Sequence, residues 1–227
     1  LMEAMRDCDK LCRHLHLPLQ SGSSQILKVM NRHYTKEQYL ELVEKIRKAV
    51  PDIALTTDII VGFPGETEED YQATEALVRK ADFASAFTFV YSPRSGTRAA
   101  EMENQIPADI QKDRIMRLVA LVNSLTRQKS EKYVGKTVEI LCEDYDAKKK
   151  LYLGRDEFGR MGYFASRDNR IGEFVRLKIT EANGISLFGV PVAEDGATGG
   201  PDFPEESDRS EKSVKSDKKT DGAGGAN

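Results

Sequence analysis

The sequence has no tryptophan, only three cysteines among its 227 residues, and 7 % aromatic residues. So few cysteines, in an odd number, exclude a disulfide scaffold and indicate a reduced compartment, so we expect a cytoplasmic protein. No run approaches the roughly 18 apolar residues that a membrane span needs, and we expect no membrane partner. The formal net charge of −3 excludes a protein that is basic throughout, although a local basic face stays open.

Charge and composition divide the chain into three parts. Residues 1–133 carry equal numbers of basic and acidic side chains, and residues 134–192 have a net charge of +1. Residues 193–227 have a net charge of −4 and consist largely of Gly, Ser, Asp, Glu and Lys. Such a segment cannot bury enough apolar surface to offset its ordering entropy. We therefore predict two folded domains followed by a disordered acidic tail.

The first part alternates strand-like and helix-like patterns. The runs LHLPLQ, IALTTDIIVGF and FASAFTFVY are typical of strands, and the β-branched middle run predicts a strand buried on both faces. Helices are predicted at 36–49 behind a capping box of Thr35 and Gln38, after the cap Thr67, and from Pro107 as first helical residue. Strands alternating with helices predict a parallel sheet. Three strands are too few for a closed barrel or a well-covered sheet, so we interpret the chain as a fragment that lacks N-terminal units.

Apolar residues at helical spacing predict the buried faces of two helices. The first face comprises Tyr39, Leu42, Val43, Ile46 and Val50, and the second comprises Ile115, Leu118, Val119, Val122 and Leu125.

The second part changes to a strand period. Five short runs are separated by Gly, Asp and Asn turns, one of them predicted at 144–146. Five short antiparallel strands in residues 134–192 predict a small barrel of the OB type. Cys142 falls within the first of these strands and is predicted to be buried.

Polar, glycine-bearing loops follow all three strands of the first part, in the segments LPLQSGS, DIIVGFPGET and YSPRSGTR. Ligands of α/β folds bind at the carboxyl ends of parallel strands, so these loops predict a shared site. The alternative for the first two loops is a plain strand-to-helix turn with capping side chains, and for the third it is a surface loop with two solvated arginines. The acidic residues after the second strand argue against a phosphate site.

Two pairs of residues could suggest a metal. His14 and His16 alternate along a strand and face one side, but no third ligand has a readable spacing, so hydrogen-bonded histidines are the favoured interpretation and a metal pair the alternative. Cys8 and Cys12 are spaced like the start of a Cys-x-x-x-Cys-x-x-Cys motif, but Leu15 occupies the third position. We interpret these cysteines as incidental and predict no metal ligands in this chain.

Basic and aromatic side chains are interleaved in the predicted barrel. Basic groups neutralise phosphates and aromatic rings stack on bases, so the pattern fits RNA binding, and a solvated barrel surface with nearly balanced charges is an equal alternative. The basic residues are Lys148, Lys149, Lys150, Arg155, Arg160, Arg167, Arg170, Arg176 and Lys178, and the aromatic residues are Tyr152, Phe158, Tyr163 and Phe164.

Four segments, HLHLPLQSGS, TTDIIVGFPGETEEDY, AFTFVYSPRSGTRAA and LGRDEFGRMGYF, together resemble the MiaB-type radical-SAM tRNA methylthiotransferases. The resemblance covers residues 1–192 and implies a partial parallel (βα) barrel, namely the last three βα units of a radical-SAM barrel, followed by a TRAM RNA-binding barrel. It implies two cofactor types, S-adenosylmethionine and two 4Fe-4S clusters. Because the cluster cysteines are absent from this chain, it also implies inactivity of the chain alone. The implied reaction adds a methylthio group to carbon two of isopentenyladenosine at tRNA position 37.

The resemblance also assigns residues. It places S-adenosylmethionine against Gln20, Ser21, Asp58, Gly62, Gly65, Glu66, Phe89 and Tyr91. The tRNA anticodon stem-loop is expected to contact Arg155, Arg160, Arg167, Arg170 and Lys178. Two alternatives stay open: a methylthiotransferase acting on threonylcarbamoyladenosine or on a ribosomal protein, and a non-enzymatic RNA-binding module built on the small barrel.

Overall fold

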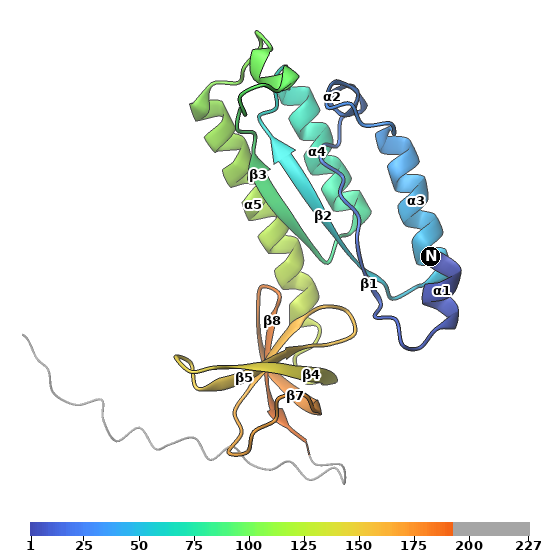
Figure 1. Cartoon of the computed structure of the whole chain (residues 1–227), viewed down its shortest axis with the longest axis vertical. Helices are drawn as coiled ribbons and strands as arrows, with labels where there is room; N and C mark the ends of the chain where they lie inside the picture. The colour runs from blue at the N-terminus through green and yellow to red at the C-terminus, as the bar shows by residue number, and fades with distance from the viewer. Residues whose placement is uncertain (193–227) are drawn as a thin grey trace, which may run out of the picture.

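The computed structural model describes residues 1–192, and the tail predicted at 193–227 lies outside the described residues. An α/β part and a small β-barrel follow one another along the longest axis of the molecule (Figure 1). The helices of the α/β part are α1 (Met2–Asp7), α2 (Ser24–Val29), α3 (Lys36–Ala49), α4 (Glu68–Ala81), the 3-10 helix η1 (Arg98–Glu101) and α5 (Ala108–Glu131). Its strands are β1 (His14–His16), β2 (Ala54–Val61) and β3 (Ser85–Val90).

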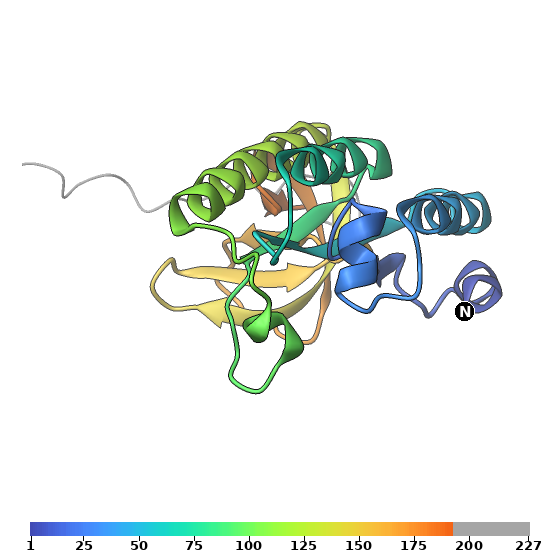
Figure 2. The same cartoon turned by 90° about the horizontal axis from the view of Figure 1, so that it is seen from above.

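The three strands form a parallel sheet in the order β1-β2-β3, which confirms the predicted topology. Helices α3, α4 and α5 lie on one side of it (Figure 2). On that side Leu55, Ile59 and Val61 of β2 are fully buried. On the other side Asp58 is half-buried, and Phe87 of β3 is 57 % exposed. The prediction that β2 is buried on both faces is therefore wrong, because helices cover only one face in residues 1–192.

Side-chain caps determine where two helices begin. Thr35 and Thr67 are the N-caps of α3 and α4, and each accepts a hydrogen bond from the amide three residues on. Gln38 and Asp70 accept from the cap amides in return, which completes two capping boxes. Pro107 is the N-cap of α5 rather than its first helical residue.

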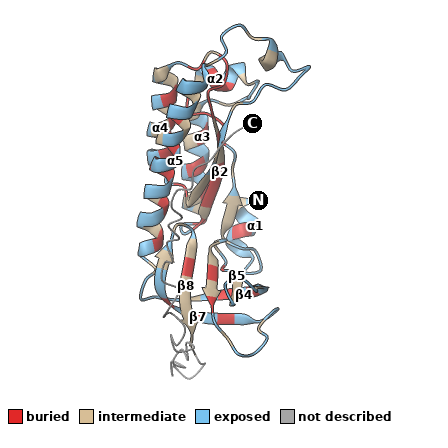
Figure 3. Cartoon of the chain, turned by 90° about the vertical axis from the view of Figure 1, so that its left-hand side faces the viewer, coloured by how far each residue is buried: buried red, intermediate tan, exposed pale blue. Residues whose placement is uncertain are grey.

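The helices bury one face and expose the other (Figure 3). Most residues of the two predicted inner faces are buried or half-buried, among them Tyr39, Val43 and Leu118. Leu42 and Val119 are exceptions, since each is 38 % exposed. Both lie at the rim of the apolar stripe, about 100° around the helix from the neighbouring buried residue.

The second part is a closed barrel with the strand order β4-β5-β6-β8-β7, an OB-type order. Its strands are β4 (Thr137–Asp146), β5 (Leu151–Arg155), β6 (Met161–Phe164), β7 (Phe174–Asn183) and β8 (Ser186–Pro191). Its core contains Ile140, Cys142, Phe164, Val175, Leu177, Ile179 and Leu187.

Two details of the predicted barrel are wrong. β6 and β8 pair in parallel, because they meet across the closing seam and no hairpin sets their relative direction. The turn predicted at 144–146 belongs to β4, which continues beyond a bulge between Cys142 and Asp144 because β5 pairs with it there.

The barrel lies near the amino ends of the sheet strands, at the opposite end of the α/β part from their carboxyl ends (Figure 1). The Arg160 guanidinium lies 3.7 Å from the ring centroid of Tyr133, just beyond α5. The Ser130 hydroxyl donates to the Gly184 carbonyl at the same junction. In residues 1–192 no helix combines the length and the apolar character that crossing a membrane requires.

Candidate functional site

The carboxyl ends of the three sheet strands meet at one edge. The Gln20 amide donates to the Asp58 carbonyl at 2.8 Å, and Gln20 forms an isolated parallel bridge with Ile59. The Tyr91 amide donates to the Val61 carbonyl at 2.9 Å. The strand-end loops that contain Gln20, Gly62 and Tyr91 are therefore neighbours, as a parallel sheet requires.

The loop after β1 is packed tightly against α4. Gln20 adopts a left-handed backbone conformation with φ of 70°, which is rare for a residue other than glycine. Ser21 is fully buried, and its hydroxyl accepts from the Ser23 amide at 3.2 Å. A Cβ on Gly22 would lie 2.4 Å from the Thr74 Cα, so glycine is required there. This packing holds the Gln20 backbone in place beside β2.

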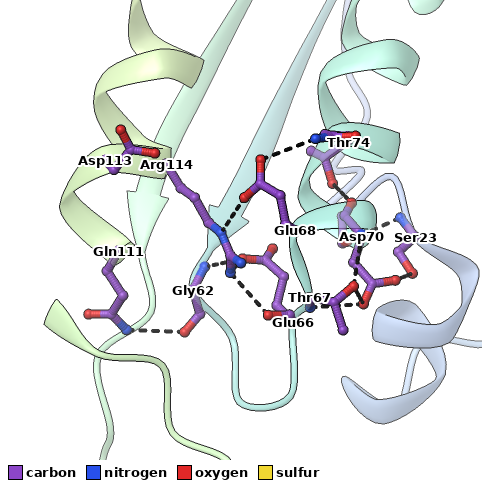
Figure 4. Close-up of polar contacts among 12 residues, drawn as sticks. Ser23, Gly62, Glu66, Thr67, Glu68, Asp70, Thr74, Gln111, Asp113 and Arg114 are labelled. Atoms are coloured by element: carbon purple, nitrogen blue, oxygen red, sulfur yellow. Dashed lines mark hydrogen bonds and ion pairs between the residues drawn. The ribbon is translucent and has the colours of Figure 1, made fainter. Parts of the chain in front are cut away.

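The loop after β2 is organised around the Glu66 carboxylate (Figure 4). Its Oε2 accepts from the Gly62 amide at 2.7 Å and from the Arg114 guanidinium at 2.8 Å. The same guanidinium donates to the Glu66 carbonyl at 3.0 Å. The two side chains are only 5 % (Arg114) and 0 % (Glu66) exposed, and burial raises the pKa of Glu66 above its ordinary value. Oε1 is buried without a hydrogen-bond partner among the described residues.

Arg114 is the residue of this cluster that the sequence reasoning missed. It lies four residues before Leu118 and continues the apolar stripe of α5 by one turn. An arginine at such an inward position needs a buried partner, because an unpaired charge there is costly. That position on the stripe was the signal available in the sequence.

Gly62 and Gly65 both have positive φ, 72° and 84° respectively, but their surroundings differ. A Cβ on Gly62 would lie 2.5 Å from Cγ of Gln111, whose amide donates to the Gly62 carbonyl at 3.1 Å. A Cβ on Gly65 would meet nothing within 4 Å. Gly62 is thus a packed position, whereas at Gly65 the Cβ direction faces open space and the amide donates to the Asn104 carbonyl at 2.8 Å.

The end of β3 carries an unsatisfied hydroxyl. Tyr91 Oη is buried and has no hydrogen-bond partner among the described residues. Its ring packs edge-on against Phe63, with ring centroids 5.0 Å apart. Phe89 lies opposite Ile60 in the register and is 49 % exposed on the open face of the sheet. A hydroxyl without a hydrogen-bond partner among the described residues and free space beside Gly65, both near one sheet edge, fit a ligand with polar groups, such as a nucleoside.

The two histidines of β1 share one hydroxyl. Thr56 Oγ1 lies 3.1 Å from His14 Nε2 and 3.1 Å from His16 Nδ1, so both rings face the same side as predicted. His16 Nε2 lies 3.4 Å from Asp58 Oδ2. Burial, with a smaller contribution from His16, lowers the pKa of His14. These contacts fit the interpretation of hydrogen-bonded histidines.

Within residues 1–192 no group of three or more His, Cys, Asp or Glu side chains is placed to hold a metal ion. Cys8 and Cys12 are exposed and free, and Cys142 is buried in the barrel core. The residues described therefore do not fit an iron–sulfur cluster, which needs three or four cysteine thiolates together.

The predicted RNA-binding side chains are in unequal environments. Arg155, Arg160 and Arg170 each pair with a carboxylate, at 3.0, 2.6 and 3.2 Å. Arg160 lies at the junction of the two parts, over the ring of Tyr133, and is only 17 % exposed. Arg167 and Lys178 are exposed. Two of the aromatic residues considered for stacking are occupied, since Phe164 is buried in the core and Phe158 packs against Arg160.

Comparison with known proteins gives two sequence families. Residues 1–78 match the Radical SAM superfamily, and residues 131–192 match the TRAM domain. The chain is 50 % identical over 189 residues to the tRNA-2-methylthio-N(6)-dimethylallyladenosine synthase of Caldicellulosiruptor saccharolyticus, covering 83 % of this chain and 40 % of that protein. Proteins of the same name are 50 % identical over 194 residues in Clostridium botulinum (strain Langeland) and 51 % identical over 187 residues in Clostridium perfringens (strain SM101). These alignments cover 85 % and 82 % of this chain and 43 % and 42 % of the relatives.

Among solved structures, coproporphyrinogen III oxidase (HemN) from Escherichia coli, described as a radical SAM enzyme, aligns with a TM-score of 0.44 at 15 % identity. The alignment covers 73 % of this chain and 41 % of that one, and no conclusion depends on so weak a likeness. The chain spans about two fifths of the length of the curated relatives it matches. A radical-SAM sequence implies S-adenosylmethionine and iron–sulfur chemistry. The radical-SAM and TRAM matches, together with about 50 % identity to these synthases, support the resemblance to the MiaB-type tRNA methylthiotransferases that the four motifs predicted.

Proposed function

We propose that this chain provides part of the S-adenosylmethionine site and the RNA-binding barrel of a tRNA methylthiotransferase. The reaction proposed is addition of a methylthio group to carbon two of isopentenyladenosine at tRNA position 37. One observation carries the proposal. Three strand-end loops meet at one sheet edge, where Gly65 borders open space and Tyr91 Oη has no hydrogen-bond partner within residues 1–192. The names of the relatives support the choice of reaction.

The proposed cofactor residues divide into two groups. The first group offers contacts to a ligand. Asp58 and Phe89 lie on the open face of the sheet, Gly65 borders open space, and Tyr91 Oη has no hydrogen-bond partner among the described residues. Gln20, Ser21, Gly62 and Glu66 hold the two loops in shape through the bonds described above. S-adenosylmethionine held by these residues beside a reduced cluster would supply the radical chemistry for hydrogen removal from the base, and a second molecule would supply the methyl group. The two 4Fe-4S clusters of the proposal have no ligand set in residues 1–192.

The proposal extends to the partner and the setting. The RNA is taken to be a tRNA anticodon stem-loop, bound in the cytoplasm by the barrel at residues 134–192, with residues 1–133 as the catalytic part. Arg155, Arg160, Arg167, Arg170 and Lys178 are its proposed contacts. Support comes from the TRAM match and from the exposed basic side chains of the barrel.

The test of the reaction uses the full-length protein that contains this sequence. It is expressed in a bacterial strain that lacks its own methylthiotransferase, and tRNA hydrolysates are analysed by mass spectrometry. The expected product is 2-methylthio-isopentenyladenosine, and Tyr91→Phe and Gly65→Val are expected to lower its yield. Modification of threonylcarbamoyladenosine or of a ribosomal protein instead would contradict the substrate.

A second test uses the 227-residue chain itself. Because cluster ligation of the amino-acid end of S-adenosylmethionine is missing, calorimetry should show weak binding or none. The chain should nevertheless bind an anticodon stem-loop, with affinity that falls as salt rises. RNA binding by the chain, together with a full-length protein that modifies nothing, would favour the alternative of a non-enzymatic RNA-binding module.

A further inference from the structure

The outer surface of the barrel carries an apolar row across β5, β6 and β8. Leu153 pairs with Tyr163 in the register, and Tyr163 pairs with Phe188. Side chains alternate along a strand, and the neighbours Phe164 and Leu187 fill the barrel core. The three side chains of the row therefore lie on the outside of the barrel.

The two rings of this row are already stacked. The ring centroids of Tyr163 and Phe188 are 5.1 Å apart with an interplanar angle of 16°, and both residues are half-buried. Outer positions of a small barrel are usually polar, as Arg176 and Lys178 are on β7. An aromatic row at such positions adds nothing to the barrel core and is typical of a binding surface.

Three consecutive lysines lie beside the row, in the turn from β4 to β5. The Asp146 carboxylate accepts from the amides of Lys148 and Lys149 at 3.0 and 3.1 Å, which fixes the turn. The Lys149 ammonium lies 4.7 Å from the Tyr163 ring centroid and 3.7 Å from the Asp146 carboxylate. Lys148 and Lys150 are exposed. The turn thus presents positive charge at the edge of the stacked rings.

We propose that Leu153, Tyr163, Phe188 and the lysine turn form one surface, the aromatic–lysine face, that binds unpaired nucleotides of RNA. A base takes the place of the Lys149 ammonium on the Tyr163 ring, because stacking does not depend on sequence, and the displaced ammonium group neutralises an adjacent phosphate together with those of the other two lysines of the turn. Asp144 and Glu181 flank the row on β4 and β7, so the phosphates are confined to the lysine side. The inference rests on the proposed function in taking RNA as the ligand, but it assigns binding to residues other than the proposed arginines.

The experiment exploits the absence of tryptophan from the chain. Tyr163→Trp places a single indole in the face, and its emission is followed while a single-stranded RNA of about eight nucleotides is added. Saturable quenching that weakens with salt is expected. In anisotropy titrations with the same RNA, Tyr163→Ala and Phe188→Ala should each weaken binding about ten-fold, whereas Tyr163→Phe should retain it. Phe174→Ala is the matched control, because this ring is 70 % exposed on β7 outside the face.

The outcomes separate this inference from the function on which it rests. Unchanged affinity of Tyr163→Ala, with no quenching of the indole, would overturn the inference while RNA binding itself stands. No RNA binding by the unsubstituted chain would overturn both. If the indole emission is quenched by raising the protein concentration without RNA, the face binds a second copy of the chain. That outcome would also overturn the inference. Phe188→Ala could loosen the barrel. If that variant unfolds, the result is decided instead by Tyr163→Phe and by the indole signal of Tyr163→Trp.

Discussion

The Arg114 guanidinium donates to the Glu66 carboxylate at 2.8 Å, and both side chains are almost completely shielded from solvent. Through this pair, helix α5 holds the loop that follows β2, because the same carboxylate oxygen also accepts a hydrogen bond from the Gly62 amide. A buried pair contributes little net stability when intact, but its partners depend on each other strongly. The pair therefore matters most for the shape of the loop at the proposed cofactor site.

Removing the guanidinium should be costly. Arg114→Met leaves the Glu66 carboxylate buried and uncompensated, so we expect a loss of about 3–5 kcal/mol in the free energy of unfolding of the α/β part, measured by urea denaturation. Adding Glu66→Gln to Arg114→Met should recover a large share of that loss.

The matched control is Arg127→Met on the same helix. Arg127 pairs with Glu131 at 2.8 Å, but the two side chains are 74 % and 52 % exposed. An exposed pair of this kind contributes less than about 1 kcal/mol. Equal losses for the Arg114 and Arg127 variants would contradict the dependence on burial.

The two glycines of the β2 loop should respond differently to alanine. Gly65→Ala meets no neighbouring atom and should cost about 1 kcal/mol for its positive φ. Gly62→Ala has similar strain and also collides with Gln111, so it should cost about 1–3 kcal/mol more by urea denaturation. Shortening the neighbour in Gly62→Ala/Gln111→Ala should relieve the collision. A larger loss at Gly65 than at Gly62 would show that the two environments are not as described.

His14 should make stability sensitive to acid. Burial lowers the pKa of His14 in the folded protein, so the unfolded chain binds its proton at higher pH than the fold does. The contribution of neutral His14 to the free energy of unfolding is fully present above the ordinary pKa of about 6.5. It is lost as pH falls from there through the lowered pKa of the folded protein. We expect His14→Gln to reduce the fall in unfolding midpoint between about pH 7 and about pH 5. A fall of the same size in the variant would exclude His14 as its cause.

Closure of the barrel should depend on one glycine. A Cβ on Gly154 would lie 1.9 Å from the Leu141 carbonyl oxygen, where β5 passes the bulge of β4. Gly154→Ala should therefore unfold or open the barrel and abolish RNA binding, as followed by far-UV circular dichroism and anisotropy. Gly172→Ala is the control, since a Cβ there meets nothing and only the strain of φ 87° is added. A folded, RNA-binding Gly154→Ala protein would show that β4 can move away.

Local sequence signals predicted much of the fold because each acts over a few residues. The capping box of Thr35 and Gln38, the order of strands and helices, and the burial of Cys142 follow from such signals. The exposed Leu42 and the parallel pairing of β6 with β8 do not, since they depend on which surfaces meet in three dimensions.

The candidate site divides in the same way. That loops follow three strand ends could be read directly, and parallel pairing then places them together. The stripe position of Arg114 indicates a buried arginine, but its partner could not be predicted, because Glu66 is 48 positions away and looks like part of an acidic helix start. The individual contacts of the predicted cofactor residues remain predictions for the tests above.

The position of the barrel has a consequence for any RNA that engages both parts. The barrel adjoins the amino ends of the sheet strands, whereas the proposed cofactor residues gather beyond their carboxyl ends. The eight residues of β2 alone separate these ends by about 26 Å at roughly 3.3 Å per residue. Under the proposed function, an RNA that contacts the barrel and the cofactor residues at the same time has to span at least that distance, so the length of the RNA would limit the choice of substrate together with the identity of the base.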